Sequence, residues 1–106
     1  MDRDSSVLVF LELCPDKRVL PISWECVTAG RKLADALRCG FHGLIMGNSV
    51  GEAAVEVSRV GLDGVYTVDH PLLESYHPET YGFAMLRAYE QIKPKAILTY
   101  APFCAN

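Results

Sequence analysis

Short apolar runs alternate with longer amphipathic stretches along this chain of 106 residues. Each run has little polar alternation, which is typical of strands buried on both faces of a sheet. The amphipathic stretches between the runs predict helical links, and helical links between strands predict parallel pairing through right-handed crossovers. The pattern therefore predicts an α/β domain. The predicted strands are residues 7–11, 41–46, 65–68 and 95–100.

The first amphipathic stretch, residues 21–39, predicts a helix. Its apolar positions recur every three or four residues, so they share one helical face. We expect that face to be buried; it consists of Ile22, Cys26, Ala29, Leu33 and Leu37. Ser23 is the expected cap of the helix, and Gly40 is its expected end.

A shorter helix is predicted after the second strand. Ser49 and Glu52 fit a capping box, in which the serine caps the first turn and the glutamate reaches back. Gly61 is expected to stop this helix. The residues expected to face inward are Ala53, Val57 and Val60.

The link between the third strand and the last helix is ordered by its local sequence. Pro71 ends the strand, because proline cannot donate to a sheet ladder and keeps His70 extended. A helix then opens at Pro78, which suits the first helical turn, and Glu79 complements the helix dipole. The expected inward face of this helix is Tyr81, Met85, Ala88 and Ile92.

Composition and charge narrow the classes of function. The net charge is −3 and the pI is near 5.5, so no basic field favours nucleic acid or an anionic membrane. No apolar run approaches the ~20 residues that a membrane helix needs, and we see no signal segment. We expect a cytoplasmic protein, or one of the mitochondrial matrix if a presequence was removed. The four cysteines are expected to be reduced thiols, since their spacing matches no standard zinc finger.

Ligands of open α/β sheets bind at the carboxyl ends of the strands. Asp69 and His70 lie at one such end and can act as an acid/base pair; alternatively, Asp69 caps the next turn and His70 packs or contacts a partner. Glu12 ends the first strand and should lie near Tyr100 if the first and fourth strands are neighbours. The candidate crevice or partner contacts are Glu12, Asp69, His70 and Pro71.

The loop of residues 47–51 also joins a strand to a helix, where backbone N–H groups can hold a phosphate. It lacks both the G-x-G-x-x-G and the G-x-x-x-x-G-K-[ST] fingerprint, so a capped turn is favoured over a phosphate site. No nucleophile is coupled to Asp69 and His70, and we assign no catalytic, cofactor-binding or metal-binding residue.

Four segments, in order along the chain, resemble the N-terminal domain of the electron transfer flavoprotein α subunit. They are Ala29-Gly-Arg-Lys-Leu-Ala-Asp, Gly64-Val-Tyr-Thr-Val-Asp-His-Pro-Leu-Leu, His77-Pro-Glu-Thr-Tyr and Lys93-Pro-Lys-Ala-Ile-Leu. The resemblance covers almost the whole chain. The chain departs from the family pattern at Leu13, where a polar residue is common, and at His77, where Thr is usual.

The resemblance implies an adenine nucleotide alpha hydrolase-like fold, a three-layer sandwich with a parallel sheet of strand order 3-2-1-4, incomplete at the C-terminus. Residues 1–106 would form the N-terminal part of that domain, without the FAD-binding C-terminal domain. In the family, a heterodimer with a β subunit carries electrons from flavin dehydrogenases to a quinone oxidoreductase or another acceptor, as in fatty acid oxidation. FAD lies mainly in the C-terminal domain and AMP or a second FAD lies in the β subunit, so no cofactor residue is carried onto this chain.

We therefore expect a scaffold and subunit-interface segment, not an enzyme. The first alternative is a stand-alone nucleotide-binding module of the same α/β class, and the second is a small enzyme that uses Asp69 and His70. Three helices over four strands leave part of one sheet face thinly covered, so we expect a fragment of a longer protein or a face that partner surface completes. Such a face also predicts self-association of the isolated chain, or marginal stability.

Overall fold

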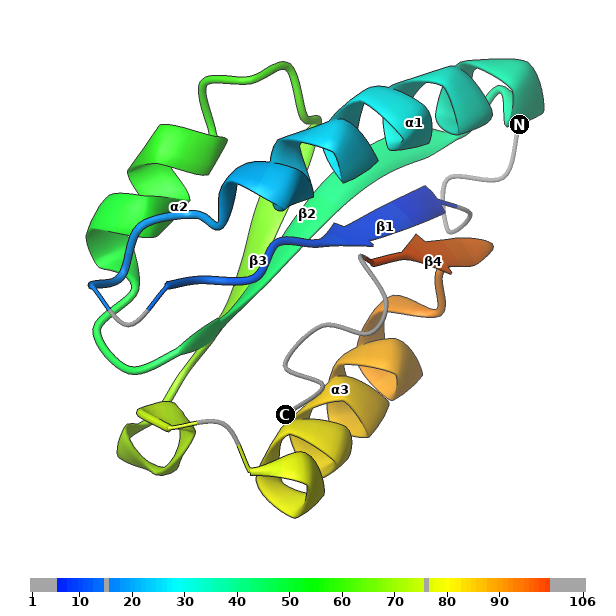
Figure 1. Ribbon diagram of the computed structural model, residues 1–106. Helices are drawn as coiled ribbons and strands as arrows, with labels where there is room; N and C mark the ends of the chain where they lie inside the picture. Colours follow the sequence, from blue (N-terminus) through cyan, green and yellow to red (C-terminus); the bar gives the residue numbers. More distant parts are fainter. Residues whose placement is uncertain (1–5, 15, 76, 100–106) are drawn as a thin grey trace.

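The computed structural model describes residues 6–14, 16–75 and 77–99. Its centre is a four-stranded sheet in the order β3-β2-β1-β4, and the neighbouring strands pair in parallel (Figure 1). The predicted strand order 3-2-1-4 and the predicted parallel pairing are therefore confirmed. The strands are β1 (Ser6–Phe10), β2 (Gly40–Gly47), β3 (Gly64–Asp69) and β4 (Ala96–Leu98).

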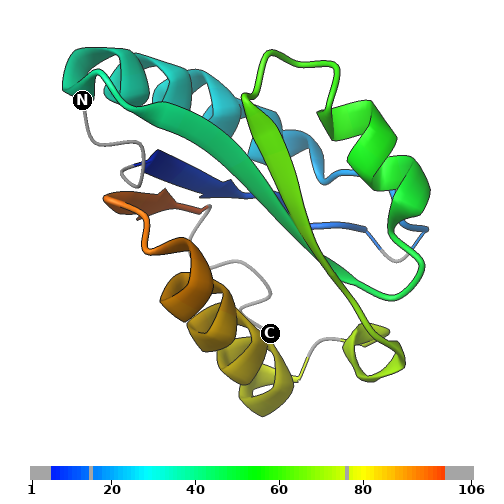
Figure 2. The same cartoon turned by 180° about the vertical axis from the view of Figure 1, so that it is seen from behind.

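Helices cover both faces of the sheet and make the fold three-layered (Figure 2). The chain moves outward from β1 to β2 and β3, then returns past them to β4. Right-handed crossovers therefore place the first two helices on one face, here called the first face, and the third helix on the second face. The first face carries α1 (Pro21–Leu37) and α2 (Gly51–Val57), and the second carries α3 (Pro78–Ile92), which follows the 3₁₀ turn η1 (Pro71–Leu73).

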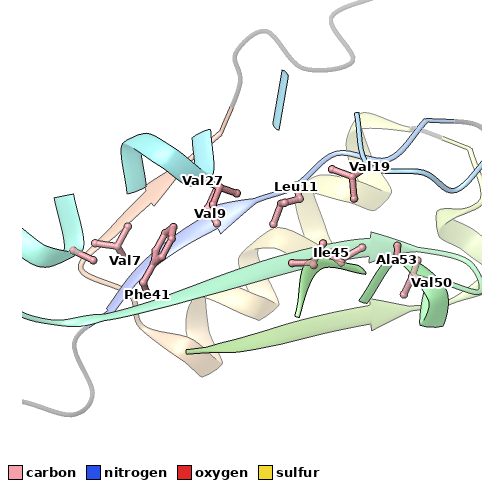
Figure 3. Close-up of a cluster of buried hydrophobic side chains, with 11 residues drawn as sticks. Val7, Val9, Leu11, Val19, Val27, Phe41, Ile45, Val50 and Ala53 are labelled. Carbon is pink, nitrogen blue, oxygen red and sulfur yellow. The ribbon is translucent and has the colours of Figure 1, made fainter. Parts of the chain in front are cut away.

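Strand β1 contributes to the hydrophobic clusters on both faces of the sheet, and all five of its residues are buried. Its side chains alternate between the faces. Val7 and Val9 belong to the cluster beneath α1 and α2, which Figure 3 shows, whereas Leu8 and Phe10 belong to the cluster beneath α3. A fully buried side chain of this kind contributes roughly 1.5–3 kcal/mol, so β1, like β2, joins the two layers into one domain.

Helix α1 buries a different face from the predicted one. Its buried residues are Ser23, Val27, Gly30 and Ala34, whereas Ala29 is exposed and Leu37 is 42% exposed. The helix lies so close to β2 that a Cβ atom on Gly30 would overlap the Phe41 ring. Small residues are therefore needed at the line of contact, and the larger Trp24, Cys26 and Leu33 pack at its sides. The predicted helix is confirmed, but its predicted inward face is wrong by one position.

The ends of α1 also correct the prediction. Leu20 holds the cap position without a side-chain hydrogen bond, while the expected cap, Ser23, is buried and its Oγ accepts the Glu12 N–H at 3.1 Å. Arg38 closes the helix in the left-handed region with a φ of 56°. Gly40 therefore begins β2 and does not end α1.

Helix α2 buries Ala53 and Val57 as predicted, but Val60 is 38% exposed. The helix ends at Val57. Beyond its cap the hydrogen bonds join residues three positions apart, as in the bond from the Val60 N–H to the Val57 carbonyl at 3.2 Å. This tighter winding turns Val60 away from the sheet. Gly61 then takes a φ of 88°, as a turn that leaves the helix requires.

On the second face, α3 agrees with the prediction. Tyr81, Met85, Ala88 and Ile92 all belong to the cluster that packs on the sheet. Strand β3, by contrast, is half-exposed, and Tyr66 is 41% exposed. Its β-branched and aromatic residues favour a pleated strand, yet they are only partly covered because β3 is the edge of the sheet.

Candidate functional site

Strand β3 ends at Asp69, whose register partner on β2 is Gly47. This pairing brings the Asp69 carboxylate to the loop that opens α2. Its Oδ1 accepts the Ser49 N–H at 2.7 Å, and its Oδ2 accepts the Val50 N–H at 3.1 Å. A strand residue therefore caps α2, and the predicted capping box of Ser49 and Glu52 is wrong.

The neighbouring His70 serves a different turn. Its backbone N–H donates to the Gly47 carbonyl at 2.8 Å, and its Nδ1 accepts the Leu72 N–H at 3.1 Å. His70, not Asp69, thus caps the turn that follows, and the backbone N–H of Leu72 engages Nδ1 of its ring. Pro71 begins η1 and is exposed. Its role as a partner contact, and that of His70, stay predictions.

A pocket of about 420 Å³ lies at the carboxyl ends of β1 and β2. Its apolar lining includes Phe10 and Met46 from the strands and Leu73 from η1. The charged side chains that line it are Glu12, Lys17 and Glu74. This is the edge at which α/β sheets bind ligands, and it contains Glu12 from the predicted set but not Asp69 or His70.

Three loops meet over this pocket through the carboxylate of Glu74. Lys17, from the loop between β1 and α1, donates to Glu74 Oε1 at 2.8 Å. Asn48, from the loop between β2 and α2, donates to the same oxygen at 3.0 Å. These two hydrogen bonds, first that of Lys17 and then that of Asn48, lower the pKa of the Glu74 carboxyl from its ordinary value of 4.5. Glu74 is therefore a charged bridge between the loops.

The charge of this edge does not suit a phosphate. Among the described residues that line the pocket, Glu12 and Glu74 oppose the one ammonium of Lys17, so their formal charges leave a surplus of one negative charge. The N–H groups of Ser49 and Val50, which could have held a phosphate in the loop of residues 47–51, already bond to Asp69. A turn between β2 and α2 is confirmed, but Asp69 and not the predicted capping box accepts its N–H groups.

Glu12 is placed by its backbone. Its N–H donates to Ser23 Oγ at 3.1 Å, and its carbonyl accepts the Leu20 N–H at 2.7 Å. The start of α1 is thereby fixed to the end of β1, and the Glu12 side chain lines the pocket. Tyr100 lies outside the described residues, so its expected proximity to Glu12 stays a prediction.

Sequence reasoning missed Lys17, Asn48 and Glu74. Asn48 directly follows the second strand, so its place at the ligand-binding edge was a usable signal. No local sequence pattern could have paired Lys17 with Glu74, because the two residues are separated by 57 positions.

The described cysteines, Cys14, Cys26 and Cys39, are free thiols. Burial, and then the negative charge of Glu25, raise the pKa of the Cys26 thiol, so this sulfur is a poor nucleophile at neutral pH. Within residues 6–14, 16–75 and 77–99, no group of three or more His, Cys, Asp and Glu side chains is placed to hold a metal ion.

The sequence profile of the electron transfer flavoprotein domain matches residues 7–102, from β1 to beyond β4. The chain belongs to the electron transfer flavoprotein domain family. The resemblance noted in the sequence is thus confirmed, and the observed sheet is the one that the family implied.

Three relatives match most of this chain, and the names of two of them include electron transfer. Protein FixB of Azorhizobium caulinodans is 37% identical over 84 residues, covering 76% of this chain and 23% of the relative. The electron transfer flavoprotein subunit alpha of Thermoanaerobacterium thermosaccharolyticum is 31% identical over 86 residues, with 81% and 26% covered. The acryloyl-CoA reductase electron transfer subunit beta of Anaerotignum propionicum is 32% identical over 81 residues, with 76% and 22% covered. The chain spans about a quarter of the length of these curated relatives.

None of the helices in the described part of the chain has the length and apolar character needed to span a bilayer. The helices that are present instead place apolar side chains against the sheet.

Proposed function

We propose that this chain is the scaffold and subunit-interface segment of an electron transfer flavoprotein α subunit and has no catalytic site of its own. The observation that carries the proposal is the family match over residues 7–102, joined by the α-subunit name of one relative. The pocket at the carboxyl edge supports a structural role, because hydrogen bonds between its own loops occupy Lys17, Asn48 and Glu74.

In this proposal, the chain pairs with a β subunit in a complex that passes electrons from a flavin dehydrogenase to a quinone oxidoreductase or another acceptor. FAD would be held by α-subunit sequence outside these 106 residues, and AMP or a second FAD by the β subunit. The names of the relatives, which include an acryloyl-CoA reductase electron transfer subunit, support this class of function. We propose a cytoplasmic location, or the mitochondrial matrix if a leader precedes the chain.

Co-purification tests the proposal. The chain, with an affinity tag, is co-expressed with an electron transfer flavoprotein β subunit from the same genome, and the retained proteins are weighed by native mass spectrometry. We expect an equimolar complex, and we expect the chain purified alone to carry no flavin absorbance. A folded chain that retains no β subunit, or that binds FAD by itself, would contradict the proposal.

The pocket itself favours a second candidate, a stand-alone nucleotide-binding module. Its volume of about 420 Å³ lies within the range of ligand sites, roughly 300–1,000 Å³, and Lys17 lines it. Calorimetric titration with AMP and ATP separates the two functions, with Lys17→Ala as the matched variant. Micromolar binding that Lys17→Ala removes would favour the module. We expect no heat of binding, because the described lining is acidic and Asp69 already accepts the N–H groups of Ser49 and Val50.

A further inference from the structure

Strand β3 is the longer of the two strands at the edges of the sheet. It has six residues, whereas β4 at the opposite edge has three. Within the described residues β3 pairs with β2 alone, and Figure 2 shows it at the edge of the sheet. One side of the β3 backbone therefore faces β2, and the other side faces away from the sheet.

The outward backbone groups of β3 follow from the bond that closes its pairing with β2. The His70 N–H, directly after the strand, donates to the Gly47 carbonyl at 2.8 Å. Backbone groups of successive strand residues point to opposite sides, so the N–H and C=O groups of Tyr66 also face β2. The N–H and C=O groups of Val65 and Thr67 then point away from the sheet.

This outer edge lacks the features that usually protect the edge of a sheet. Residues 65–68 contain no charged residue and no proline. The strand also keeps an unbroken register with β2 from Gly64 to Asp69, without a bulge. Valine, tyrosine and threonine are residue types that favour a strand. An edge of this length and composition is therefore a template for one more strand.

A hollow lies beside this edge on each face of the sheet. On the second face, a hollow of about 600 Å³ between β3 and α3 is lined by Tyr66, Val68 and Phe83, among others. On the first face, a hollow of about 410 Å³ between β3 and α2 is lined by Val55 and Val65, among others. Phe83 is 63% exposed and Val55 is 52% exposed. The thinly covered face that the sequence predicts is the strip of sheet between β3 and α3.

The edge and the two hollows together fit an extended peptide. Such a peptide would bond to the outward N–H and C=O groups of Val65 and Thr67. Its side chains alternate between the two faces of the sheet, so they would enter the two hollows in turn. We propose that the outer edge of β3 is the site at which an extended segment of the β subunit joins the sheet as an added strand. The inference rests on the proposed function, which names the β subunit as the partner.

The chemistry of the two hollows describes the segment that fits them. Because apolar side chains line both hollows, the segment carries apolar side chains on both of its faces and no charge at its centre. Its main-chain bonds to β3 supply affinity, and its alternating side chains supply specificity.

Hydrogen exchange measured by NMR, on the chain alone and in complex with the β subunit, tests the proposal amide by amide. The Tyr66 amide is bonded to β2 and should be protected in both samples. The amides of Val65 and Thr67 should exchange fast in the chain alone and at least about a hundredfold more slowly in the complex, because they gain acceptors. Contact through side chains alone would not give this alternation along the strand.

A proline at position 67 tests the same bond by substitution. Proline has no N–H, and a strand tolerates it at an edge position whose N–H faces solvent, so Thr67→Pro should stay folded. It should raise the dissociation constant of the complex at least about tenfold, because a donor is lost and the ring meets the incoming strand. The matched control, Thr67→Val, keeps the N–H and should leave the constant unchanged. Circular dichroism checks the folding of both variants.

The outcomes separate this inference from the proposed function. A β subunit that binds the wild type and folded Thr67→Pro equally, or that leaves the Val65 and Thr67 amides in fast exchange, would overturn the inference and leave the pairing of subunits intact. A chain that retains no β subunit would overturn both. Protection of the two amides in the chain alone, rising with concentration, would mean that a second copy occupies the edge and would also overturn the inference. The exchange measurement uses the wild-type chain, so it decides the question even if Thr67→Pro is unfolded.

Discussion

The two faces of the sheet are built from the same strands and differ in how well they are closed. Among the residues that the structure describes, the cluster on the first face contains eleven buried residues and the cluster on the second contains six. On the first face α1 buries four residues, whereas on the second α3 buries one, Ala88. Since buried apolar area is the main stabilising term, the first face should carry most of the stability. The second face is left open for contact.

The difference also separates two ways of holding a helix. α1 lies close to the sheet through Gly30 and Ala34, and its position is fixed by backbone contact. α3 packs through larger, partly buried side chains such as Tyr81 and Met85, and the unbranched thioether chain of Met85 can adapt its shape. A closely fitted helix tolerates few changes at its contact line, so this family member should be sensitive on the first face and tolerant on the second.

The largest effects on the free energy of unfolding are expected from two adjacent residues of β2, one on each face of the sheet. Ile45 is fully buried on the first face and Met46 is 3% exposed on the second. We expect Ile45→Ala to lower the free energy of unfolding by about 3–4 kcal/mol and Met46→Ala by about 2 kcal/mol, because Met46 borders an open pocket that water can fill. Urea denaturation measures both. A greater loss from Met46→Ala would reverse the ranking of the two faces.

Two helical glycines sharpen the comparison. Gly30→Ala should cost about 1–3 kcal/mol, since the added methyl group overlaps the Phe41 ring. Gly82 in α3 has nothing within 4 Å of the position of an added Cβ, and Gly82→Ala should raise stability by about 0.5–1 kcal/mol. Thermal melts of the two variants should move in opposite directions. Equal shifts would mean that α1 is not held as closely as described.

Smaller losses of stability are expected when the two residues at the end of β3 that accept backbone N–H groups are replaced. Asp69 accepts two N–H groups at the start of α2, and Asp69→Ala should cost about 1–2 kcal/mol. His70 accepts one N–H in η1, and His70→Ala should cost only about 0.5–1 kcal/mol. Chemical denaturation checks the order. Loss of an enzymatic activity in His70→Ala, with folding intact, would instead revive the acid/base reading of this pair.

The smallest effect is expected at Glu74, which is largely solvent-exposed. Its pKa is lower when folded, owing first to Lys17 and then to Asn48. Its contribution to stability is therefore fully present above the unfolded pKa and is lost as the pH falls through the lower folded value. Glu74→Gln should be slightly less stable than the wild type at pH 7, and the two should converge under acid conditions. A difference that grows as the pH falls would contradict the assigned cause.

How far the sequence predicts this structure depends on how local each feature is. The strands, the start of α3 at Pro78 and the parallel pairing follow from short-range patterns and from the helical links between strands. The strand order 3-2-1-4 was implied by the family resemblance. The inward face of α1 does not, because hydrophobicity selects the larger Cys26 and Leu33, while close contact with β2 selects Gly30. Hydrophobic periodicity indicates which residues share an apolar face, but it does not predict how close the helix lies to the sheet.

The candidate site was predicted least well, for a related reason. Asp69 caps a helix 20 positions earlier and Lys17 bonds to Glu74 57 positions later. Such partners are chosen by sheet register and loop placement, which no local motif encodes. The serine of a good capping box was therefore a false signal at Ser49, since a better acceptor arrives from β3.

Native-state hydrogen exchange of the dilute protein tests the contrast between the two faces most directly. Amides of α1 should exchange only through global unfolding, whereas those of α3 should exchange through a smaller, local opening of lower free energy. The reason is that α1 is anchored by four buried residues and α3 by Ala88 alone. Equal free energies of opening for α1 and α3 would contradict the account that one face of this domain is closed and the other is open.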